Sequence, residues 1–173
     1  SQSHEAVNNA AEAVLKLYPA PLEAPSIIRV GQEGNVSDQL LPFHVARVEQ
    51  LYKDKFQATV KERLLTAATA IGIPEHLANI FILIEITVRP VVEQINTLAE
   101  DTEQEGSLQR IQSLFGTLDS LSFNHDLGIE LPNLVDLPLE EFEAKIFDTV
   151  ADRYGCSTEL VARFRSIARL TRD

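Results

Sequence analysis

Apolar residues recur every three to four positions along most of the chain, a spacing that places them on one face of a helix. Only seven of the 173 residues are glycine, and the apolar spacing is three to four rather than two, so helices are expected to dominate. We therefore expect an all-α, single-domain bundle of about six helices over residues 1–173. The predicted helices run from Ser3 to Leu17, Pro42 to Gly72, Pro74 to beyond Val91, Leu108 to Leu121, Pro138 to Tyr154 and Thr158 to Leu170.

Two helix-poor segments interrupt this pattern. Prolines 19, 21 and 25 cannot continue a helix and favour an extended backbone, so residues 19–38 are predicted to form an extended arm. A short strand at Ile27 to Val30 is an alternative. Residues 122–138 are the second segment, and a connection of this length is usually either a functional lid or a packed loop.

The helix predicted to begin at Pro74 is apolar on two faces, which is typical of a helix in the middle of a bundle. It contains Glu85 between two isoleucines. Because Arg89 follows four residues later, we predict a buried ion pair between Glu85 and Arg89. The alternative is a proton-transferring group, since burial raises the pKa of a carboxyl. Pro90 is expected to bend the helix.

The charge of the chain limits its partners. The formal net charge is -11, which disfavours general binding to nucleic acid or to an anionic membrane. No apolar run approaches the roughly 20 residues of a membrane span, so we expect no membrane association. One cysteine excludes an internal disulfide framework and favours a reducing, cytoplasmic compartment. The absence of methionine, even at position 1, suggests a piece of a longer protein.

A stretch near the C-terminus, "VADRYGCSTELVARF", joins two predicted helices through a glycine. Ala151 lies four residues before Gly155, Ser157 two residues after it and Val161 six residues after it. This stretch resembles the turn region of bacterial helix-turn-helix DNA-binding domains of the lac-repressor type. In that motif the alanine allows close helix contact, the glycine makes the turn, and the valine packs the second helix onto the first.

The resemblance covers about twenty residues, and short motifs of this kind often match by chance. It implies that Ser157, Thr158 and Glu159 reach base edges while arginines meet phosphates. The acidic Glu159 opposes this arrangement. The possible DNA-binding residues are Ser157, Thr158, Arg163, Arg165, Arg169 and Arg172.

The alternative for residues 139–173 is a plain helical hairpin. On a helical wheel Arg165, Arg169 and Arg172 lie opposite the apolar face, which predicts a basic stripe exposed to solvent. In the hairpin alternative this basic tail pairs with acidic residues of the same protein. "GIPEHLANIFILI" and "GCSTELVARFRSI" are weakly similar, as expected of two helical hairpins that need the same turn glycine and the same apolar spacing; an internal duplication is the alternative.

Other candidate chemistry is sparse in this sequence. Cys156 precedes a predicted helix, where the helix dipole would lower the pKa of a thiol, but a small residue filling the turn is the simpler reading. The histidines fall in no metal-binding pattern, so we predict no metal and no cofactor; a single axial ligand from His44 or His76 remains open. No residue is assigned a catalytic role.

We therefore expect a non-enzymatic module that binds another protein or its own copy, forming a dimer for example, as a regulator, adaptor or assembly factor. The first alternative is a DNA-binding transcriptional regulator using the C-terminal helix-turn-helix. The second is a helical bundle that binds a small molecule or cofactor, with residues 122–138 as a lid over a pocket.

Overall fold

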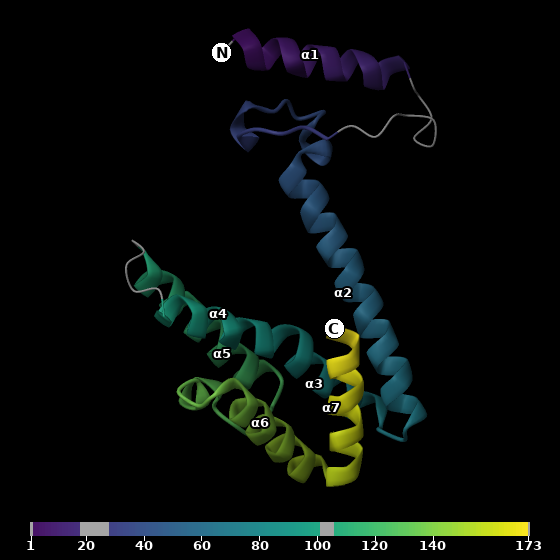
Figure 1. Cartoon of the computed structure of the whole chain (residues 1–173), viewed down its shortest axis with the longest axis vertical. Coiled ribbons are helices and arrows are strands. Elements are labelled where there is room, and N and C mark those ends of the chain that lie inside the picture. The colour runs from purple at the N-terminus through teal and green to yellow at the C-terminus, as the bar shows by residue number, and fades with distance from the viewer. Residues whose placement is uncertain (1, 18–27, 101–105, 173) are drawn as a thin grey trace. The chain divides into compact units, whose positions relative to one another are not determined.

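The computed structural model describes residues 2–17, 28–100 and 106–172 (Figure 1). These residues form helices joined by turns, and the one β-type contact among them is an isolated bridge between Arg29 and His44. The all-α prediction is confirmed. The helices are α1 (Gln2–Leu17), α2 (Val45–Ala70), α3 (Glu75–Leu83), α4 (Arg89–Glu100), α5 (Ser107–Asn124), α6 (Leu139–Tyr154) and α7 (Thr158–Arg172), with the short helical turns η1 (Glu33–Asn35), η2 (Leu41–Phe43), η3 (Ile84–Val88) and η4 (Leu131–Leu134).

The contacts between residues divide the chain into two compact units. Unit 1 comprises Ser1–Ala58 and unit 2 comprises Thr59–Asp173. Apolar spacing alone does not reveal this division, because α2 continues from one unit into the other without a break.

Unit 2 is organised around three phenylalanine rings that contact one another. Phe81 of α3 lies 5.3 Å from Phe147 of α6 and 5.4 Å from Phe164 of α7, measured between ring centroids. Phe147 and Phe164 are 6.0 Å apart. All three pairs are tilted, an arrangement that aromatic rings prefer to face-to-face stacking. The central position predicted for the third helix is confirmed by the complete burial of Phe81.

The expected bend at Pro90 corresponds to an irregular turn just before it. The single π turn η3 spans Ile84–Val88 and joins α3 to α4. A proline has no amide hydrogen, and its ring clashes with the carbonyl four residues earlier. The wider π turn accommodates this disturbance, and such turns are frequent at functional sites.

Two helical hairpins in unit 2 use the same glycine turn. Gly72 and Gly155 both have positive φ, at 97° and 67°. The residue after each glycine donates its amide hydrogen to the carbonyl five residues back, Ile73 to Ala68 and Cys156 to Ala151. This is the bonding pattern of a Schellman turn, which satisfies the last carbonyls of a helix. The similarity seen in the sequence therefore coincides with a shared way of ending a helix.

The connection between α5 and α6 is a packed loop rather than a lid. Leu127, Leu131 and Val135 are buried in the core of unit 2. The amide of Leu131 donates to the hydroxyl of Ser122, which ties the loop to the end of α5. The lid alternative for residues 122–138 is therefore not favoured by the structure.

Unit 1 is held together mainly by polar contacts. Asn8 of α1 donates to the carbonyl of Asn35, and Arg29 donates to the side chain of Asn8. Among its described residues only Val36, Leu40 and His44 are buried. Residues 18–27, which include most of the predicted arm and Ile27 of the alternative strand, lie outside the described residues; from residue 28 the arm contains one bridge and the turn η1.

Candidate functional sites

A group of five charged side chains lies where η3, α4, α6 and α7 meet. We call Glu85, Arg89, Glu143, Arg165 and Arg172 the charge cluster. Glu143 is its centre: it accepts a hydrogen bond from Arg89, lies 3.3 Å from Arg172 and lies 3.7 Å from Arg165. Only 5% of Glu143 is exposed, so water can do little to stabilise its negative charge. The three guanidinium groups compensate that charge instead.

Glu85 is the second buried carboxylate of the charge cluster. Nε of Arg172 lies 2.9 Å from Oε1 of Glu85, but that oxygen accepts no hydrogen bond. Burial raises the pKa of Glu85, the nearby Arg172 opposes the rise, and the negative charge of Glu143 adds to it. Glu85 is therefore the less well compensated of the two carboxylates.

The predicted ion pair between Glu85 and Arg89 is replaced by partners from other parts of unit 2. Arg89 contacts Glu143 of α6 and, at 2.6 Å, Glu93 of α4, while Glu85 contacts Arg172 of α7. The positive charge of Arg89 still lowers the pKa of Glu85. A spacing of four residues along a helix identifies only partners on the same helix. In the folded chain α6 and α7 bring oppositely charged side chains closer to Arg89 and Glu85.

The basic stripe predicted to face solvent on α7 is largely engaged inside the protein. The side chains of Arg165 and Arg172 are only 22% and 27% exposed, because they turn toward Glu143 and Glu85. The guanidinium of Arg165 also lies 5.6 Å from the ring centroid of Phe147, in cation–π range. This arrangement corresponds to the hairpin alternative, in which the basic tail pairs with acidic residues of the same protein.

The other possible DNA-binding residues lie at the surface, whereas Ala151 and Val161 of the resemblance are buried in the core of unit 2. Ser157 accepts a hydrogen bond from the amide of Leu160 and so caps α7. Arg163 pairs with Glu159 at 2.6 Å. Thr158 and Arg169 are exposed. Of the six possible DNA-binding residues, Thr158 and Arg169 are the two that are exposed and engaged in neither a cap nor an ion pair among the described residues.

Cys156, His44 and His76 have surroundings that explain them by packing and hydrogen bonding. Burial raises the pKa of the half-buried Cys156 thiol, opposite to the activation that a helix N-terminus would give. His44 accepts from the amide of Ala46 at the start of α2, and its other ring nitrogen donates to the carbonyl of Gly31. His76 packs edge-on against Tyr154. The described residues contain no group of three or more His, Cys, Asp or Glu side chains placed to hold a metal.

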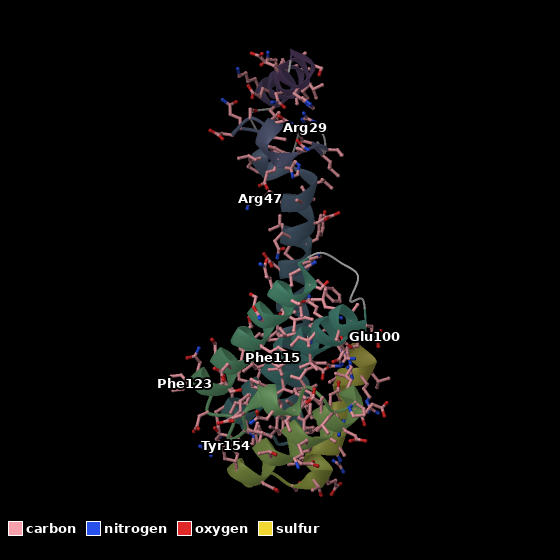
Figure 2. All side chains as sticks on the ribbon, turned by 90° about the vertical axis from the view of Figure 1, so that its left-hand side faces the viewer. Arg29, Arg47, Glu100, Phe115, Phe123 and Tyr154 are labelled. Carbon is pink, nitrogen blue, oxygen red and sulfur yellow. The ribbon has the colours of Figure 1, made fainter. Side chains whose placement is uncertain are left out.

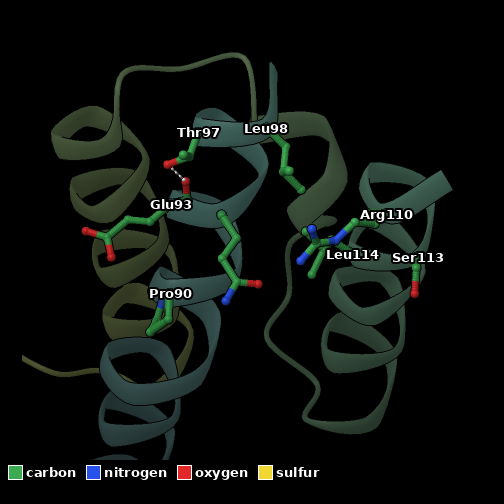
Figure 3. A pocket seen from close by; sticks show the side chains of 8 residues that line it. Pro90, Glu93, Thr97, Leu98, Arg110, Ser113 and Leu114 are labelled. Carbon is green, nitrogen blue, oxygen red and sulfur yellow. Dashed lines mark hydrogen bonds between the residues drawn. The ribbon is translucent and has the colours of Figure 1, made fainter. Parts of the chain in front are cut away.

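An open groove with a volume of about 550 Å³ lies between α4 and α5 (Figure 3). Figure 3 shows Arg110 reaching from α5 toward α4, and Thr97 donating a hydrogen bond to the backbone carbonyl of Glu93. We call this groove between α4 and α5 the Arg110 groove. Its lining mixes Pro90, Leu98 and Leu114 with polar groups. Residues 122–138, the predicted lid, do not line this groove, and binding of a small molecule by the bundle stays a prediction.

Unit 1 presents an apolar surface on the first half of α2. Leu51, Tyr52 and Phe56 are 53%, 68% and 67% exposed. Figure 2 shows side chains of this helix, with Arg47 labelled. We define the α2 surface as these three residues together with Val48, Lys53 and Lys55. Because large apolar side chains gain from leaving water, such a surface typically marks a site of interaction with another molecule.

Comparison with models of known protein families, with curated proteins and with solved structures finds no match. Among the described residues, no helix combines the length and the apolar character needed to cross a membrane.

Proposed function

We propose that this chain is a protein-interaction module, acting as a regulator, adaptor or assembly factor, and that it binds a second copy of itself through the α2 surface. The observation that supports the proposal most is the exposure of Leu51, Tyr52 and Phe56 on one helix. Aromatic residues at the centre of an interface contribute most of the binding energy in many complexes.

Charge favours a second copy as the partner. Helix α2 carries five basic and three acidic residues, a net charge of +2. The rest of the chain has ten basic and 23 acidic residues, a net charge of -13. A second molecule therefore offers α2 an oppositely charged partner, and complementary charge increases the rate and specificity of association.

The test is light scattering coupled to size exclusion over a range of protein concentrations. We expect the wild-type mass to rise with concentration from monomer toward a defined oligomer. Phe56→Glu places a charge in the apolar surface and is expected to weaken association at least about tenfold, the equivalent of 1.4 kcal/mol.

Phe123→Glu is the matched control, because Phe123 of α5 is also exposed, at 88%, but lies outside the α2 surface. It is expected to leave the wild-type association unchanged. A wild-type protein that stays monomeric at every soluble concentration would overturn the proposal, as would equal effects of the two substitutions.

DNA binding through α7 is the second candidate, and the left-handed Gly155 turn followed by the exposed Thr158 and Arg169 favours it. The engagement of Arg165 and Arg172 in the charge cluster weakens it. If α7 binds a duplex, Arg169→Ala should lower affinity for any sequence and reduce the salt slope by about one. A mixture with a short duplex at low salt that shows no increase in mass rules this candidate out.

A further inference from the structure

A second groove on unit 2 combines apolar walls with acidic residues. It lies between the end of α4, the start of α5 and the segment after η4, with a volume of about 560 Å³. The buried Ile95 and Val135 and the partly exposed Ile111, Phe115 and Leu137 form its apolar lining. Figure 2 labels Phe115 on α5 and Glu100 at the end of α4. We call it the acidic groove.

The charged residues that the structure describes in the lining of the acidic groove are both negative. Glu100 and Asp136 are exposed at its edge, and none of the described lining residues is a lysine, arginine or histidine. Neither carboxylate has an ion pair or hydrogen bond with another described residue. The groove therefore suits an apolar segment that carries basic side chains beside its apolar residues.

The α2 surface has this composition. Tyr52 and Phe56 are four residues apart and so lie on one side of the helix, while Lys53 and Lys55 project on either flank. The exposed Glu49, four residues before Lys53, lies on the same flank as that lysine, so the surface has two lysines against one glutamate. Two other grooves on unit 2 are less suitable, because the Arg110 groove contains an arginine and a third groove contains Lys61 and His125. Like charges placed opposite each other across an interface weaken association, which disfavours those grooves as sites for the lysines of α2.

We propose that the α2 surface of one molecule binds in the acidic groove of a second copy, with Tyr52 and Phe56 against Phe115 and Leu137 and with the flanking lysines beside Glu100 and Asp136. This inference rests on the proposed self-association and names the surface that accepts α2. The contact is heterologous, since two different patches meet. Two reciprocal contacts give a closed dimer, whereas successive single contacts give an open chain.

A heterologous contact is tested by complementation between two variants. The first is Lys53→Glu with Lys55→Glu, which makes the α2 surface acidic. The second is Glu100→Lys with Asp136→Lys, which makes the groove basic. Each variant alone should associate at least about tenfold more weakly than wild type, because like charges then face each other. An equimolar mixture should form a complex containing both variants, since the basic groove can accept the acidic α2 surface.

The control pair is Lys145→Glu and Asp119→Lys, which change exposed charges on α6 and α5 outside both surfaces. These variants should associate like wild type, and circular dichroism should show unchanged helix content for all variants. A wild-type monomer at all concentrations overturns both the self-association and this inference. Association weakened by the α2 variant but not by the groove variant overturns this inference alone, as does a mixture of the two variants that forms no complex.

Discussion

The two units of this chain differ in how they are held together. Of the 29 described residues that are buried, three belong to unit 1 and 26 to unit 2. Unit 2 has a continuous aromatic and aliphatic core. In unit 1, hydrogen bonds between polar side chains and backbone groups connect α1 to the segment before α2. A region with few buried apolar contacts opens at low free energy, so unit 1 is expected to be the less stable unit. Large apolar side chains of unit 1, Leu51, Tyr52 and Phe56, remain exposed at the surface.

The largest effect should come from the aromatic centre of unit 2. Phe164→Ala removes a fully buried ring that contacts both Phe81 and Phe147. We expect the free energy of unfolding to fall by about 3–5 kcal/mol, because the lost transfer energy adds to the cost of the cavity. Urea denaturation followed by circular dichroism measures this change.

Phe56→Ala is the matched substitution in unit 1, since the Phe56 ring is two-thirds exposed. It should change the free energy of unfolding of the monomer by no more than about 0.5 kcal/mol. Similar losses for Phe164→Ala and Phe56→Ala would contradict the difference in burial between the two units.

The next largest effect should come from the charge cluster. Glu143→Gln leaves Arg89, Arg165 and Arg172 without their shared carboxylate. Removing one partner of a buried ion pair typically costs about 3–5 kcal/mol, and we expect about 3 kcal/mol because Arg89 retains Glu93. Thermal and urea unfolding at neutral pH check the value.

Glu85→Gln is the comparison for Glu143→Gln and should cost less at neutral pH. Burial raises the folded-state pKa of Glu85 above its ordinary value of 4.5, so protonation favours the folded state. The stability linked to this group is therefore present below pH 4.5 and is lost as the pH rises through the raised pKa. Glutamine does not titrate, so the stability of Glu85→Gln relative to wild type should increase over that pH window. A constant difference from pH 4 to 8 would contradict this.

Local patterns in the sequence predict the helices of this protein well. Pro74 and Pro138 immediately precede α3 and α6, and Gly72 and Gly155 follow the ends of α2 and α6. Proline and glycine act on the backbone within a few residues, so their effect can be read without knowing the fold. The division into two units depends on long-range burial, which the continuous apolar pattern of α2 does not reveal.

The charge cluster was predicted only in part. A glutamate between two isoleucines indicates a buried charge at Glu85. Its partner Arg172 lies 87 positions away in the chain, so the sequence does not identify it. Glu143 was missed, although it shares the spacing of the buried face with Ile146 and Val150. A charged residue at a position of the apolar face was the signal that could have identified it.

The smallest effect tests whether unit 1 opens independently of unit 2. His44 precedes the first residue of α2 and accepts from the amide of Ala46, so it caps the helix. Its other ring nitrogen donates to the carbonyl of Gly31. His44→Ala removes both contacts and should destabilise the start of α2 by about 1 kcal/mol, the usual cost of losing a cap. Hydrogen exchange should therefore accelerate about fivefold at residues 45–48, while the amides of α3 and α6 exchange as in wild type.

His76→Ala is the control, because His76 is exposed and lies in unit 2. Equal acceleration of exchange in α3 and α6 on His44→Ala would mean that the two units unfold together, and the comparison between them would then describe burial but not stability.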